Sequence, residues 1–148
     1  MPKYDLEKIL PHDKPMILLD DLREIDLKNG ILISEFQPKR EMLFASSDGI
    51  DALCGIEFMA QTIGCYAYFK NAKNKPQKGL LLGTRLYNNS TDYFLYNQTY
   101  TVKVHEVFTD GEIVVFDCII YDRDGEEVSC ATVNAYQGEG IEELLKNG

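Results

Sequence analysis

The stretch DGIDALCGIEFMAQTIGCYAYFKN, from Asp48 to Asn71, decides the fold of this chain. Apolar side chains recur on every side of a helix drawn through it: Leu53, Ile56, Phe58, Met59, Ala60, Ile63, Tyr66, Ala67 and Phe69. A helix that is hydrophobic all round is expected to be buried on all sides. The sequence therefore predicts one long central helix, with Asp48 as its N-terminal cap and Asp51 reaching back from the third helical position.

Glu57 is the acidic residue in the middle of this apolar stretch. Gln61 follows it by four residues, so the two side chains are expected to point the same way. A buried carboxylate without a partner is costly unless its pKa rises and it protonates, so such a group usually has a partner or a chemical task. One interpretation is a structural pair with Arg85 or with backbone amides. The other is a general acid in an apolar site.

Composition limits the classes of function. The 148 residues suit one domain, residues 1–148, with a single core. A net charge of -9 argues against nucleic-acid binding and disfavours an anionic membrane surface. No signal peptide is apparent in the N-terminal residues, and Glu57 argues against a membrane span. A cytoplasmic location is expected because four cysteines without short paired spacing indicate reduced thiols: Cys54, Cys65, Cys118 and Cys130.

Strands are predicted on both sides of the helix. Before it, 22–26 and 31–36 flank the hairpin signal Asn29-Gly30, and residues 4–10 are expected to form a short helix that Pro11 ends. After it, one strand is expected from residue 79 through Gly83-Thr84-Arg85. The last three predicted strands are 94–108, 112–121 and 127–136, and a final helical turn is expected at 141–146.

Turn signals connect the last three strands into an antiparallel meander, because Asp110-Gly111 and Asp124-Gly125 lie between them. The whole order predicts an α+β architecture in which a curved antiparallel sheet wraps around a single helix. The side of the helix that the sheet leaves open would be covered by a second protomer.

Groups for acid and base chemistry are few. Nucleophile motifs, phosphate loops, dinucleotide fingerprints and metal-ligand clusters are absent from the sequence, so no cofactor or metal is expected. His12 is a second candidate beside Glu57, with a turn histidine bonded to the backbone as the alternative. His105 follows Val104 in a predicted strand, which favours a surface role. Amides at the helix N-terminus can polarise a thioester carbonyl.

Four lysines make the segment after the helix the most basic part of an acidic protein: Lys70, Lys73, Lys75 and Lys78. A solvated loop is one interpretation. The other is a docking patch for an anionic partner.

Four segments resemble the hotdog-fold 3-hydroxyacyl-[acyl-carrier-protein] dehydratases, and among them the branch associated with aryl-polyene biosynthesis: LPHDKPMILLDDL (10–22), GIEFMAQTIGCYA (55–67), GLLLGTRLY (79–87) and ATVNAYQ (131–137). The resemblance implies a hotdog fold, with two protomers that join their sheets. It also implies that acyl chains, attached to a carrier protein through phosphopantetheine, enter a tunnel at the dimer interface.

The resemblance also implies roles for individual residues. Glu57 would protonate the departing 3-hydroxyl, and Gln61 would support it. A histidine would take the proton alpha to the thioester, but its H-F-P-G segment is replaced here by Met42-Leu43-Phe44-Ala45, and Leu43 cannot accept a proton. His12 is then the candidate base. Substrate contacts are expected from Gly49, Ile50, Asp51, Leu53, Gln61, Gly83 and Arg85.

Three interpretations of the function remain open. The first is a dehydratase in which Glu57 and His12 act on 3-hydroxyacyl thioesters. The second is a non-catalytic or half-active hotdog subunit that binds acyl carriers or completes a heterodimer. The third is a thioesterase in which Glu57 activates water. The sequence does not distinguish a homodimer from a heterodimer.

Overall fold

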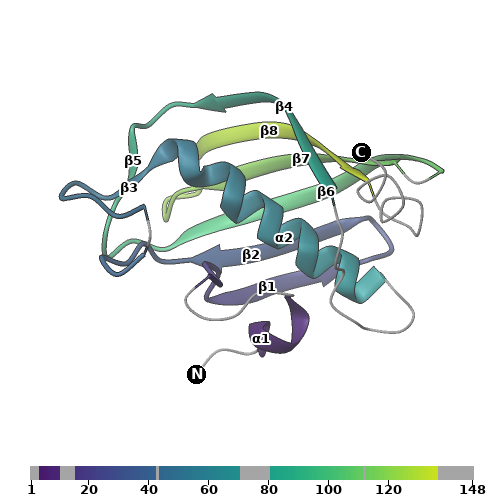
Figure 1. Ribbon diagram of the computed structural model, residues 1–148, viewed down its shortest axis with the longest axis horizontal. Coiled ribbons are helices and arrows are strands. Elements are labelled where there is room, and N and C mark those ends of the chain that lie inside the picture. Colours follow the sequence, from purple (N-terminus) through teal and green to yellow (C-terminus); the bar gives the residue numbers. More distant parts are fainter. Residues whose placement is uncertain (1–3, 11–15, 43, 71–80, 112, 137–148) are drawn as a thin grey trace, which may run out of the picture.

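A six-stranded antiparallel sheet and one long helix form the body of the molecule. The computed structural model describes residues 4–10, 16–42, 44–70, 81–111 and 113–136. In this part of the chain the sheet has the strand order β1-β2-β6-β7-β8-β4. Helix α2 (Gly55–Lys70) crosses one face of the sheet and packs against β2, β6 and β7 (Figure 1). The predicted α+β arrangement of a sheet around one central helix is therefore confirmed.

The main strands are β1 (Asp21–Asp26), β2 (Ile31–Phe36), β4 (Leu81–Asn89), β6 (Tyr100–Asp110), β7 (Ile113–Tyr121) and β8 (Glu127–Tyr136). Two short strands, β3 (Ile50–Asp51) and β5 (Tyr93–Phe94), pair in a separate small sheet. Helix α1 (Leu6–Ile9) begins after Asp5, whose carboxylate accepts a hydrogen bond from the backbone of Glu7. A 3-10 helix, η1 (Ala52–Cys54), leads directly into α2.

Three glycines make the turns that the sequence predicts. Gly30, Gly111 and Gly125 have φ angles of 72°, 62° and 82°, in the left-handed region that glycine adopts easily. Strands β6, β7 and β8 follow one another as the expected meander. The predicted strand 94–108 is wrong in its first part, because β5 pairs with β3 and Asn97, at φ 64°, turns the chain before β6.

Alternating side chains of the sheet form the core with the inner face of the helix. Val102 and Val104 on β6 and Phe116 on β7 are buried, as is Phe58 on α2. The Phe58 ring stacks on Phe36 of β2, with ring centroids 3.7 Å apart and planes at 10°. Burying an aromatic side chain contributes about 1.5–3 kcal/mol, so this core fixes the helix on the sheet.

The helix starts later than the sequence predicts. Residues 50 and 51 pair with β5, so the helix does not begin at Asp48. Asp51 is the cap instead: its carboxylate accepts a hydrogen bond of 2.9 Å from the backbone N–H of Leu53. The helix ends at Lys70, while the predicted turn at 141–146 lies outside the described residues.

One side of the helix is uncovered at its N-terminal end, so the expectation of burial on all sides is wrong for this chain alone. Leu53 is 68% exposed and Glu57 is also exposed. Farther along, Leu10 packs against Gly64, where an added Cβ would meet the Leu10 side chain at 3.0 Å. The described part of the N-terminal segment, through Leu10, therefore covers the later part of this side. Among the described residues, no helix is long and apolar enough to cross a membrane.

Candidate functional site

Glu57 lies in the first turn of α2 with its carboxylate exposed. Within the described residues, that carboxylate has no hydrogen bond or ion pair, and its charge helps to raise the pKa of Cys54 after the larger effects of burial and of Asp51. The side chain of Arg85, its expected structural partner, lies outside the description, although the backbone of Arg85 belongs to β4. The start of the central helix therefore presents a carboxylate toward open space.

Gln61 has the opposite surroundings, although the sequence predicts that it points the same way as Glu57. It is 4% exposed. Its Oε1 accepts a hydrogen bond of 2.8 Å from the Leu18 backbone, and its Nε2 donates one of 2.7 Å to the Met16 carbonyl. The amide thus holds residues 16–18 beside the helix, one turn after Glu57.

The loop before the helix contains three of the residues predicted to contact substrate. Gly49 has φ 150°, and an added Cβ would collide with the carbonyl of Phe94. The Gly49 carbonyl accepts hydrogen bonds from the backbone and the hydroxyl of Ser46, at 2.9 and 3.0 Å. Ile50 is 1% exposed in the core, and Asp51 caps η1. Gly49 and Ile50 build the loop, and Asp51 fixes the helix start.

Leu53 and Gly83 also belong to the predicted substrate-binding set, and Leu53 is exposed. Leu53 lies four residues before Glu57 on the uncovered side. Gly83 is half-buried on β4 opposite Asn134, and an added Cβ would meet no atom within 4 Å. The candidate base His12 and the substituted position Leu43 lie outside the described residues.

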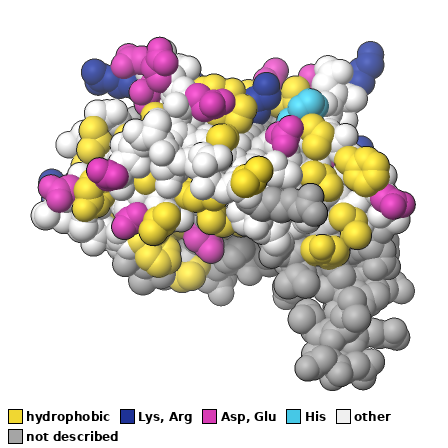
Figure 2. Space-filling model, turned by 90° about the horizontal axis from the view of Figure 1, so that it is seen from above, with side chains coloured by type: hydrophobic (Ala, Val, Ile, Leu, Met, Phe, Trp, Pro, Cys, Tyr) yellow, Lys and Arg dark blue, Asp and Glu magenta, His cyan; other side chains and the backbone are white. Residues whose placement is uncertain are grey.

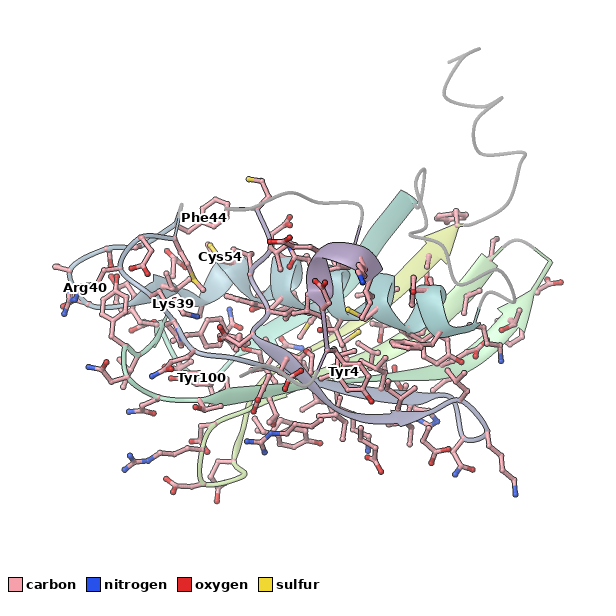
Figure 3. The ribbon with its side chains drawn as sticks, turned by 90° about the horizontal axis from the view of Figure 1, so that it is seen from below. Tyr4, Lys39, Arg40, Phe44, Cys54 and Tyr100 are labelled. Atoms are coloured by element: carbon pink, nitrogen blue, oxygen red, sulfur yellow. The ribbon has the colours of Figure 1, made fainter. Side chains whose placement is uncertain are left out.

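Exposed apolar side chains that sequence reasoning did not select accompany this end of the helix. Phe44 and Met16 are exposed, and Figure 3 shows Phe44 at the same end of α2 as Cys54, with Lys39 and Arg40 nearby in the loop. On β4, Leu86 is 78% exposed. Seen from the side where β4 lies, the surface carries hydrophobic groups among acidic ones (Figure 2). Periodicity could not identify these residues because each belongs to a loop or a sheet edge.

A cavity of about 120 Å³ lies at the other end of the helix. It is lined by Ile63, Tyr66, Ala67, Lys70, Glu106, Thr109, Val114, Phe116 and Ala135. The Glu106 carboxylate accepts hydrogen bonds from the hydroxyls of Tyr66 and Thr109, and the Lys70 ammonium lies 3.8 Å away. Lys73, Lys75 and Lys78 of the predicted docking patch lie outside the described residues. In the part that is described, no group of three or more His, Cys, Asp or Glu could hold a metal ion.

The family of the chain follows from its sequence. Residues 4–146 match the sequence profile of the ApeP-like family, which is described as ApeP dehydratase. The chain belongs to the ApeP-like dehydratase family. This membership supports a dehydratase-like function and confirms the resemblance found in the sequence. A search of curated proteins found no match to this chain.

Solved structures share the fold of this ApeP-like chain. The dehydratase heterocomplex ApeI:P from Xenorhabdus doucetiae matches with a TM-score of 0.83 and 21% identity over 98% of this chain and 99% of that one. The E. coli PaaI protein from the phenylacetic acid degradation operon matches with a TM-score of 0.61 and 13% identity, over 79% of this chain and 82% of that one. A hypothetical thioesterase with coenzyme A from Streptococcus pneumoniae matches with a TM-score of 0.58 and 14% identity, over 79% of this chain and 84% of that one. These similarities confirm the hotdog fold.

Proposed function

We propose that this chain acts as a dehydratase subunit that removes water from a 3-hydroxyacyl thioester, with Glu57 as the general acid. The observation that carries the proposal is the Glu57 carboxylate itself. It lies at the start of the central helix, without a partner among the described residues, on the side that the chain leaves open. Leu53 provides an apolar neighbour one turn earlier.

The chemistry requires one proton acceptor and one proton donor. A base removes the proton from the carbon alpha to the thioester, a double bond forms, and the bond between the beta carbon and its hydroxyl oxygen breaks. Glu57 gives its proton to that oxygen, so that water leaves and a 2-enoyl thioester remains. An acid of this kind must be protonated near neutral pH, which burial in an apolar site favours because it raises a carboxyl pKa. Glu57 is exposed in the single chain, so we expect a second protomer to supply the apolar surroundings that this acid requires.

His12 is our candidate for the base. Gln61 fixes Met16 beside the helix, and the four residues from Met16 back to His12 can span at most about 14 Å. This length is enough for an imidazole to approach a substrate bound near Glu57, in the same protomer or in its partner. The alternative is that a second hotdog subunit supplies the base.

The partner that we propose is such a second hotdog subunit, joined through β4. This strand is an edge of the six-stranded sheet and carries the exposed Leu86. An open strand edge with an apolar side chain is an unstable surface unless another chain covers it. ApeI:P, the structure with the higher similarity reported above, is a heterocomplex, which favours a heterodimer over a homodimer for this chain. We place the single domain 1–148 in the cytoplasm, without a cofactor.

The test is to incubate the purified chain, alone and with a second hotdog subunit, with a 3-hydroxyacyl carrier protein and to measure the enoyl product. Glu57→Gln should lower turnover about 10²–10⁴-fold, because the amide cannot donate the acidic proton. Glu24→Gln, an exposed acid on β1, is the matched control and should leave turnover unchanged. Turnover that survives in both Glu57→Gln and His12→Ala would contradict the assignment.

Two other outcomes identify the alternatives. Release of a free thiol without enoyl product would support a thioesterase, the class to which the coenzyme A structure above is assigned. Dehydration that requires the second subunit and survives Glu57→Gln would indicate a non-catalytic subunit.

We also propose that the lysines after α2 bind the acidic carrier protein. Changing Lys73, Lys75 and Lys78 to Glu should weaken carrier binding, and more so at low salt. Lys70 is best left intact because it lies near Glu106, and Arg123→Glu on the exposed β7–β8 turn, at the opposite end of the sheet from Glu106, is the control. If the triple variant and the wild type bind the carrier protein with equal affinity, these lysines belong to a solvated loop and not to a docking patch.

A further inference from the structure

We infer that Tyr87 is a positioning residue for Glu57, an inference that rests on the proposed role of Glu57 as the acid. Tyr87 belongs to the edge strand β4, and its ring reaches the junction between η1 and α2. There its hydroxyl donates a hydrogen bond to the carbonyl of Ala52. Ala52 is 35 residues earlier in the sequence, so this bond joins two distant elements.

The Ala52 carbonyl is the point that fixes the helix start. It also accepts the hydrogen bond from the backbone N–H of Gly55 that closes η1. The Tyr87 hydroxyl therefore binds the atom on which the 3-10 turn closes, and this turn ends at Gly55, two residues before Glu57. Because the direction of the first helical turn follows from this junction, the bond sets where the Glu57 carboxylate points.

Gly55 shows how closely the tyrosine approaches. Its φ of -55° and ψ of -30° are ordinary helical angles, so the backbone does not require glycine. An added Cβ would collide with the Tyr87 hydroxyl oxygen and would lie 3.1 Å from the ring carbon that carries it. A methyl group of Ile120 would be 3.2 Å away on the other side. Glycine stands at the helix start because the tyrosine hydroxyl occupies the place of a side chain.

The strand side of this contact is also fixed. Ser129 on β8 donates a hydrogen bond of 2.7 Å to the side chain of Asn89 on β4, two residues after Tyr87. Burial raises the pKa of Tyr87, so its hydroxyl keeps its proton at neutral pH and remains a donor. Strand β4 thus holds the helix start through a neutral hydroxyl, and the same strand presents the edge at which a second subunit would join.

The first test removes only the hydroxyl group from each of two tyrosines and compares the effects. Tyr87→Phe should lower kcat about 10–100-fold with little change in KM, because a misdirected acid affects the chemical step. It should also move the pH profile of kcat, which reports the acid. Tyr66→Phe is the matched control, because it removes a hydroxyl bond to Glu106 at the other end of α2. An unchanged kcat and pH profile in Tyr87→Phe, or an equal loss in Tyr66→Phe, would overturn the inference.

A double substitution tests the contact itself. Gly55→Ala should lower kcat strongly in the wild type, because its methyl group meets the Tyr87 hydroxyl. The same change should cost several-fold less in the Tyr87→Phe background, since the oxygen is gone. Equal costs in both backgrounds would show that the hydroxyl does not control the helix start.

A third measurement does not depend on dehydratase activity. Cys54 is partly exposed in η1, whereas Cys65 is buried in α2. In Tyr87→Phe the rate of alkylation at Cys54, followed by mass spectrometry, should rise several-fold while that at Cys65 stays unchanged. If the wild type shows no dehydration but Cys54 responds in this way, the positioning of the helix start stands and the proposed function fails. An unchanged rate at Cys54 would show that Tyr87 does not hold this turn.

Discussion

Glu57 and Gln61 lie one turn apart on α2, and their neighbours give them different tasks. The carboxylate faces open space, whereas the amide is buried and bonds to the backbone of Met16 and Leu18. Gln61 therefore acts on the site through the chain segment that it holds. This segment continues toward His12 in the sequence.

Replacing Gln61 with Ala should destabilise the protein by about 2–4 kcal/mol, because it leaves a buried backbone N–H and a carbonyl without partners. Urea unfolding followed by circular dichroism measures the loss. Gln37→Ala, at an exposed position after β2, is the control and should change stability by less than about 0.5 kcal/mol. Similar losses in the two variants would mean that the bonds of Gln61 contribute little.

Glu106 is expected to make the stability of the protein depend on pH. Burial tends to raise its pKa, but hydrogen bonds from Thr109 and Tyr66 and the charge of Lys70 outweigh this effect, so the pKa lies below the ordinary value of 4.5. The unfolded chain therefore binds the proton more readily than the folded chain. The stabilisation is complete above the unfolded pKa and is lost as the pH falls through the folded pKa.

Glu106→Gln should accordingly reduce stability at pH 6, and its difference from the wild type should shrink as the pH falls below about 4.5. Thermal unfolding between pH 6 and pH 3 measures this difference. The control is Glu126→Gln at an exposed turn position, which should show no such convergence. A difference that stays constant with pH would exclude the linkage.

The sequence identifies Glu57 as a candidate because a lone carboxylate in an apolar helix is locally visible. The exposure of Glu57 cannot be predicted in this way, because it depends on which distant parts of the chain cover the helix, as Leu10 does at Gly64. Tyr87 also escapes sequence reasoning. It lies inside a recognised segment, yet nothing near residue 87 indicates that its hydroxyl meets Ala52.

At the scale of elements, the small sheet of β3 and β5 determines where α2 begins. Ile50 pairs with Phe94, and this brings Gly49 against the Phe94 carbonyl at φ 150°. Only a residue without a side chain fits there. The loop then delivers Asp51 to the N-terminus of η1, where it caps the turn.

Gly49→Ala should therefore destabilise the protein by more than about 2 kcal/mol, since it adds both backbone strain and a collision. Chemical denaturation measures the effect. Gly83→Ala is the matched control: its Cβ would meet no atom within 4 Å, and it should be close to neutral. Comparable losses would show that Gly49 tolerates a side chain after movement of the loop.

Most elements could be predicted because their signals are local. Alternation identifies β6, β7 and β8, and Asp-Gly pairs identify the turns between them. The start of the helix could not be predicted, because apolar residues such as Ile50 and Ala52 are equally compatible with a strand and with a helix. The choice between the two depends on Phe94, which lies far away in the sequence.

At the scale of the whole molecule, β4 is the edge through which we expect association. Leu86→Lys should weaken the complex with a second protomer or hotdog subunit at least about 10-fold, because it places a charge at the buried interface. Analytical ultracentrifugation of the chain with its partner measures this. Phe108→Lys on β6, where Phe108 is 56% exposed, is the control and should leave association unchanged. If Phe108→Lys weakens association and Leu86→Lys does not, the interface is not at β4.

The strand order also has a consequence for synthesis on the ribosome. Strand β2 pairs with β6, and β4 pairs with β8, so each of these two strands has a sheet partner that is synthesised later. Helix α2 is synthesised before β6 and β7, two of the strands that it packs against. The meander of β6, β7 and β8 has only local pairings, so it can form first and then receive the earlier strands on its two sides. An interruption of translation before β6 therefore leaves the apolar side of the helix open to chaperones.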